Sequence, residues 1–61
     1  MKYVVQFFTE DEWITFSEHT NKEYALINAE IVSSRGDAQV MYGKECVFKV
    51  LKKEIKDESL L

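Results

Sequence analysis

The sequence has few of the residues that form covalent links and metal sites. Its 61 residues include one cysteine, two glycines, one histidine and no proline. One cysteine cannot form an internal disulfide, and one histidine with one cysteine falls short of the ligands that a zinc site needs. Cys46 lies in the apolar stretch 46–48, where a buried, reduced thiol suits a reducing compartment. We therefore expect no metal, no cofactor and a cytoplasmic location.

The chain also lacks a long hydrophobic run. Its longest uninterrupted apolar stretch, residues 24–27, is only four residues long. A helix that spans a bilayer needs about 20 apolar residues, and a secretion signal needs roughly seven or more after a basic start. We therefore expect neither a membrane span nor a secretion signal. Because so short a chain supports only one core, we expect a single domain over residues 1–52 and a charged tail over residues 53–61.

Motifs for catalysis and for nucleotide binding are missing as well. His19 and Cys46 could form a nucleophilic pair, but nothing in their spacing supplies an orienting third group or an oxyanion site. Phosphate cradles need closely spaced glycines between a strand and a helix, whereas Gly36 and Gly43 follow the predicted helix. The sequence therefore predicts a protein that is not an enzyme.

Charge argues against nucleic acid as the main partner. The chain has 8 basic and 11 acidic residues and a net charge of −3, which disfavours binding to phosphate backbones. A single basic strip interrupts this pattern, formed by Lys49, Lys52, Lys53 and Lys56. Glu54, Asp57 and Glu58 interrupt the strip, so we interpret it as a solvated strand end and tail.

A helix is predicted for residues 20–34. Its start carries a capping pattern, with Thr20 in the cap position and Glu23 three residues later, and Gly36 is expected to close it. Between residues 24 and 32 only Asn28 and Glu30 are polar. This is more apolar surface than a helix lying on one sheet can bury.

Two strand-like runs precede the helix, at residues 2–8 and 13–17. Both are rich in β-branched and aromatic residues, and acidic residues separate them. The first run is apolar on both of its faces, which indicates a central strand. In the second run Ile14 and Phe16 are expected to face the core, and Trp13 and Thr15 to face the other way.

Two further strand-like runs, residues 38–42 and 45–51, follow the helix. Gly43-Lys44 between them is a signal for a two-residue hairpin turn. The order of elements is therefore β-β-α-β-β. It predicts an α+β fold in which a small, mostly antiparallel sheet packs on one helix.

The predicted helix carries two apolar stripes. At about 100° per residue, one flank holds Ala25, Ala29 and Val32, and the adjacent flank holds Tyr24, Ile27 and Ile31, with Asn28 between them. Because alanines permit close approach, the first flank should face the sheet. The sheet could twist around the helix and cover both stripes, with Asn28 hydrogen-bonded inside, or it could leave the second stripe exposed. The first arrangement is marginally favoured.

The aromatic hairpin, the capped helix with its alanines and the returning strand, over residues 2–51, resemble small phage-encoded proteins that bind and redirect host machinery. One such family, the RNA polymerase inhibitors of T7-like phages, is similar in size and in its strand-strand-helix-strand order. This chain departs from that family by its second C-terminal strand. The resemblance implies a host protein as the partner and no residue roles.

Together these features predict a small, non-catalytic inhibitor or adaptor that binds another protein. The expected contact surface is the second stripe, with an acidic turn that steers a basic partner: Tyr24, Ile27, Ile31, Glu10, Asp11 and Glu12. The acidic turn could also hold a hard cation weakly, but it lacks the alternating ligands and the glycine of a calcium loop. One alternative is a structural homodimer that pairs through the same stripe or through the edge strand 45–51. Nucleic-acid binding through the lysine strip is the less favoured alternative.

Overall fold

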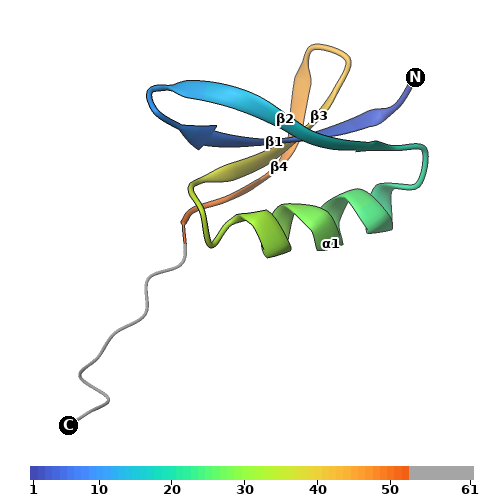
Figure 1. Cartoon of the computed structure of the whole chain (residues 1–61). Coiled ribbons are helices and arrows are strands. Elements are labelled where there is room, and N and C mark those ends of the chain that lie inside the picture. Colours follow the sequence, from blue (N-terminus) through green and yellow to red (C-terminus); the bar gives the residue numbers. More distant parts are fainter. Residues whose placement is uncertain (53–61) are drawn as a thin grey trace, which may run out of the picture.

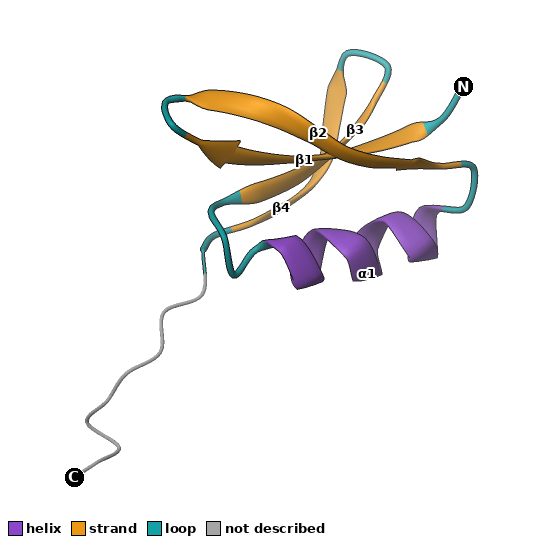
Figure 2. Cartoon of the chain, in the orientation of Figure 1, coloured by secondary structure: helices purple, strands orange, loops and turns teal. Residues whose placement is uncertain are grey.

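A computed structural model describes residues 1–52 of the chain. It contains β1 (Tyr3–Thr9), β2 (Glu12–His19), α1 (Lys22–Val32), β3 (Ala38–Tyr42) and β4 (Glu45–Val50). The strands form one antiparallel sheet in the order β2-β1-β3-β4, and α1 lies across one of its faces (Figures 1 and 2). The predicted fold and the central position of β1 are confirmed. The predicted charged tail, residues 53–61, lies outside the described residues.

Both hairpins close with two-residue turns. In the first turn, Glu10 and Asp11 have φ angles of 52° and 68°, the left-handed values of a type I′ turn. In the second turn Gly43 has a φ of 66°, as the Gly-Lys pair predicted. The first turn is shorter than the predicted acidic segment because Thr9 pairs with Glu12 inside the sheet.

Each edge strand contains one extra residue. The register between β1 and β2 shifts beside Val5, which leaves Phe16 without a partner in β1, and Val47 of β4 is left out in the same way. Such a bulge turns two consecutive side chains toward one face and increases the local twist. Phe16 accordingly reaches the helix side of the sheet, where its ring lies 6.2 Å from that of Phe7.

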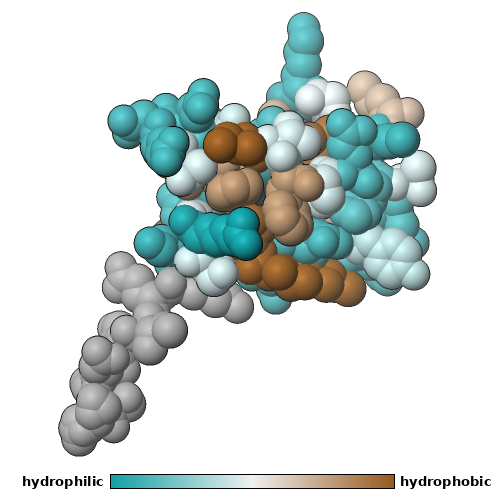
Figure 3. Space-filling view, in the orientation of Figure 1, coloured by the Kyte–Doolittle hydropathy of each residue, from teal (hydrophilic) through white to brown (hydrophobic). Residues whose placement is uncertain are grey.

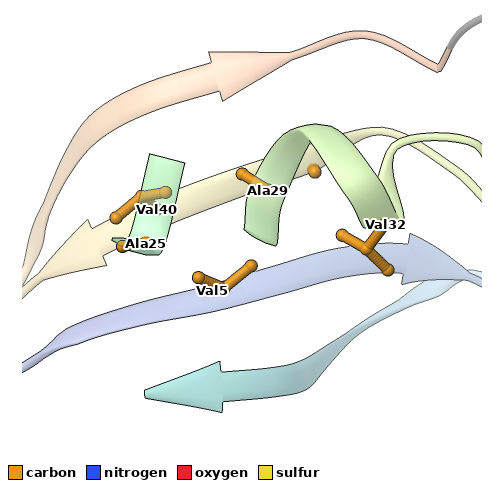
Figure 4. Packing of buried hydrophobic residues seen from close by; sticks show 6 residues of the cluster. Val5, Ala25, Ala29, Val32 and Val40 are labelled. Atoms are coloured by element: carbon orange, nitrogen blue, oxygen red, sulfur yellow. The ribbon is translucent and has the colours of Figure 1, made fainter. Parts of the chain in front are cut away.

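The hydrophobic core is small. It consists of six buried residues from α1 and the two central strands: Val5, Ala25, Ala29, Val32, Ala38 and Val40 (Figure 4). The two alanines let α1 approach the sheet closely, which confirms the predicted inward flank. Within the part of the chain that the structure describes, no fully buried side chain is larger than valine.

The faces of β2 are as predicted, but their burial is not. Ile14 pairs with Phe7 on the helix side, and Trp13 pairs with Phe8 on the opposite side. Ile14 and Phe16 nevertheless remain 37% and 40% exposed. None of the buried core residues comes from β2, which lies at the sheet edge, so these two side chains stay at the margin of the core.

Two expectations about burial are wrong for a related reason. The apolar residues on both faces of β1 indicated a strand that is buried on both sides or nearly so, yet Phe8 is 38% exposed because, among residues 1–52, α1 covers only one face of the sheet. Cys46 was expected to be buried, but the structure places its thiol, which is free and exposed, on an edge strand. Its apolar neighbours therefore did not indicate its own burial.

Helix α1 is shorter than the predicted range 20–34. Its N-cap is Asn21 and not Thr20, and its C-cap is Ser33, in a right-handed helical conformation. Gly36 therefore does not cap the helix. It lies in the loop between α1 and β3.

Gly36 allows this loop to cross the end of β1. A Cβ atom at this position would lie 2.1 Å from the carbonyl oxygen of Phe8. The loop is held there by the N–H of Phe8, which donates a hydrogen bond to the carbonyl of Asp37 at 2.8 Å. Because both groups belong to the backbone, neither can move aside without disturbing the sheet.

We expect Gly36→Ala to lower the free energy of unfolding by about 1–3 kcal/mol, since the added methyl group must displace backbone. Urea unfolding followed by circular dichroism measures this change. The control is Ser34→Ala, in an exposed position of the same loop. Equal unfolding midpoints for the two variants would contradict the close approach.

Candidate protein-binding surface on the helix

Three large apolar side chains of α1 point away from the sheet. Tyr24, Ile27 and Ile31 are 61%, 55% and 61% exposed. Their spacing of three and four residues places them on one helix face, which we call the outer stripe. Figure 3 shows hydrophobic side chains along the helix at the lower edge of the molecule. The marginally favoured expectation that the sheet covers both stripes is therefore wrong, because a sheet on one side of α1 reaches only its inward flank.

Asn28 lies at the boundary between the two flanks, as predicted. Its side-chain amide donates a hydrogen bond to the carbonyl oxygen of Tyr24 at 2.8 Å. It therefore bonds to its own helix and not to the sheet. Because this hydrogen bond stays within α1, it does not draw the sheet over the outer stripe.

Two carboxylates flank the outer stripe. Glu23 and Glu30 are exposed, and helical geometry places both within about 60° of Ile27 around the helix axis. Lys22, the one basic residue of α1, lies about 140° or more from each member of the stripe. The outer face of α1 therefore combines an apolar stripe with an acidic margin.

The acidic turn lies in a different part of the molecule. Glu10 and Asp11 form the tip of the β1–β2 hairpin, and Glu12 begins β2. This hairpin belongs to the sheet layer, whereas the exposed outer stripe belongs to α1, which lies in the other layer (Figure 1). The structure thus does not bring the two predicted halves of the site together. Glu23 and Glu30, which the sequence analysis missed, could have been found from the same helical spacing that identified the stripe.

The start of α1 fixes the position of the outer stripe. The side-chain oxygen of Asn21 accepts hydrogen bonds from the N–H groups of Glu23, at 2.8 Å, and Tyr24, at 3.4 Å. These N–H groups have no partner inside the helix, so a cap of this kind stabilises the first turn. The first member of the stripe is therefore held directly by the cap.

The other candidate sites do not form. His19 ends β2 with its Nε2 atom 2.8 Å from Ser17 Oγ, and Cys46 lies in β4 at the opposite edge of the sheet. The nucleophilic pair is therefore not assembled. Among residues 1–52 there is no pocket and no group of three side chains that could hold a metal ion.

The lysine strip is only partly within the described residues. Lys49 and Lys52 are exposed, and Lys53 and Lys56 lie outside the described range.

Within residues 1–52, α1 is too short and not apolar enough to cross a membrane. No protein-family model, curated protein or solved structure matches this chain.

We expect Asn21→Ala to lower the free energy of unfolding by about 1 kcal/mol, because two N–H groups lose their acceptor. Thr20→Ala, one residue earlier, is the matched control and should have a much smaller effect. Thermal unfolding by circular dichroism compares the two. A larger loss for Thr20→Ala would show that the cap lies at Thr20.

Proposed function

We propose that this chain is a small, non-catalytic inhibitor or adaptor that binds another protein through the outer stripe of α1. The observation that supports this proposal most is the exposure of Tyr24, Ile27 and Ile31 on a single helix face. Single exposed apolar residues are ordinary, but a contiguous patch of them is typical of an interaction surface. Amphipathic helices that bind in grooves use anchors with this spacing.

The partner that fits this surface has an apolar groove with a basic rim. Each anchor would contribute roughly 1.5–3 kcal/mol if the groove buried it completely. Glu23 and Glu30 would lie over the rim, where charge complementarity sets orientation and speeds association. The acidic turn at Glu10 to Glu12 lies in another layer and would add only to long-range attraction. The resemblance to phage proteins favours a host protein as this partner.

The same charges disfavour a homodimer through the outer stripe. Two copies paired along α1 would bring Glu23 and Glu30 of both copies together without a cation to separate them. The bulge at Val47 and the charged side chain of Glu45 disfavour pairing through the edge of β4. Bulges and charged residues on an edge strand hinder the addition of a strand from another chain. A different protein is thus the better occupant of the stripe.

We expect Ile31→Glu to abolish capture of the partner from a lysate of the source cell while the fold survives. Ile31 is 61% exposed, so the change costs little stability, but it would place a charge inside an apolar groove. With the purified partner, the dissociation constant should rise at least about thirtyfold. Proteins retained by each variant are identified by mass spectrometry, and circular dichroism checks the fold.

Lys44→Glu is the matched control. It introduces the same acidic side chain at an exposed position in the turn between β3 and β4, outside α1, and it should retain the partner. Binding of the purified partner should also weaken with added salt and with Glu23→Gln or Glu30→Gln. Equal capture by wild type and Ile31→Glu, or no specific capture by wild type, would reject the proposal.

A further inference from the structure

The face of the sheet opposite α1 is a second unpartnered surface, which we call the open face. The strand register arranges its side chains in three rows across the strands. The first row is Trp13 and Phe8, the middle row is Thr15, Gln6, Gln39 and Lys49, and the third row is Glu18, Val4, Met41 and Cys46. Along β1, Phe8 of the first row and Val4 of the third row each lie two residues from Gln6 of the middle row.

The middle row is polar and ordered. The side-chain amide of Gln39 donates a hydrogen bond to Oε1 of Gln6 at 2.8 Å. Each amide keeps further donor or acceptor capacity beyond this bond. The two glutamines therefore present a pair of groups that can bond to an identical pair.

The two outer rows are both largely apolar but differ in side-chain type. The rings of Phe8 and Trp13 lie 5.2 Å apart and are 38% and 36% exposed. In the third row Val4 and Met41 are half-buried aliphatic side chains. An aromatic row at one end thus corresponds to an aliphatic row at the other.

The charges of the open face follow the same division. The ammonium group of Lys49 lies 5.9 Å from the centre of the Trp13 ring, so its charge lies with the aromatic row. Glu18 lies in the aliphatic row, and both residues are exposed. The three rows hold one cation and one anion; Lys49 starts from the middle row and its ammonium group lies over the aromatic row, whereas Glu18 lies in the third row.

We infer that the open face binds the open face of a second copy of this chain. In this arrangement a two-fold axis runs along the middle row, between the two sheets, so that the first row of one copy lies over the third row of the other. Closed dimers with one shared interface have this symmetry. The aromatic row of each copy then lies on the aliphatic row of the other, and glutamines meet glutamines. Lys49 of each copy lies beside Glu18 of the second copy, which forms two equivalent ion pairs.

The size of the open face determines the strength of this dimer. Four strands about 4.8 Å apart and five residues long cover about 300 Å² per copy. Stable complexes bury roughly 800 Å² per partner, so the dimer should be weak and concentration-dependent. Single-stranded nucleic acid is a poorer occupant, because Lys49 is the single cation of the three rows.

Analytical ultracentrifugation of the full chain tests this inference. The mass should rise toward twice that of one chain between about 10 μM and 1 mM. Trp13 is the one tryptophan of the chain, so its fluorescence should shift to shorter wavelength over the same range. Failure of the partner capture described above would leave this result unaffected, since the two experiments examine opposite faces.

Charge reversal identifies the surface. Glu18→Lys and Lys49→Glu should each raise the dissociation constant at least about tenfold, because each places like charges in contact. An equimolar mixture of the two variants should restore association, since every contact between them pairs opposite charges. Glu10→Lys, at the hairpin tip, is the control and should behave as wild type.

Four results would overturn the inference. A monomer mass up to 1 mM would exclude the dimer at any relevant strength. A dimer that resists both charge reversals but is lost in Ile31→Glu would place self-association on α1. A mixture of Glu18→Lys and Lys49→Glu that stays monomeric would reject the two-fold arrangement. If a labelled single-stranded oligonucleotide binds the wild type and Lys49→Glu abolishes this binding, nucleic acid is the occupant of the open face.

Discussion

The structure depends on the close packing of the alanine flank of α1 against the two central strands. Ala25 and Ala29 have no exposed surface, and neither do Val5 and Val40 beneath them (Figure 4). Small side chains on the helix bring its axis near the sheet, which fixes its rotation and so turns the opposite flank to solvent. The same packing leaves the core without a large residue. Every aromatic side chain must then lie at the margin of the core or on a surface.

Several features of the fold could be predicted because local patterns determine them. The inward flank followed from two alanines with helical spacing, and the second hairpin from Gly43-Lys44. Other features depend on backbone contacts that leave no local signal. Asn21 is the cap and Thr20 is not because the helix starts one residue later than the capping pattern predicts. The role of Gly36 depends on the contact of its loop with Phe8, in a strand that is distant in the sequence.

The candidate site was only partly predictable for the same reason. Tyr24, Ile27 and Ile31 share a helix face in any regular helix, but whether a sheet covers them depends on its width and curvature, which sequence periodicity does not specify. The acidic turn drew attention because its charges are adjacent in sequence, whereas Glu23 and Glu30 are seven residues apart and share one side of the molecule only because α1 is helical. The rows of the open face could not be predicted, because each bulge shifts the register by one residue and so changes which side chains share a face.

The two proposed surfaces are compatible because they lie on opposite sides of one thin molecule. In a dimer joined through the open faces, the sheets would lie inside and both copies of α1 would point outward. Each outer stripe would stay free to enter a groove, and the acidic margins of Glu23 and Glu30 would be far from each other. Such a dimer would be bivalent, so a partner with two grooves, or two partners held near each other, would bind more tightly than one stripe allows. Weak self-association would then be strengthened by the partner, since binding at both stripes favours the paired state of the chain.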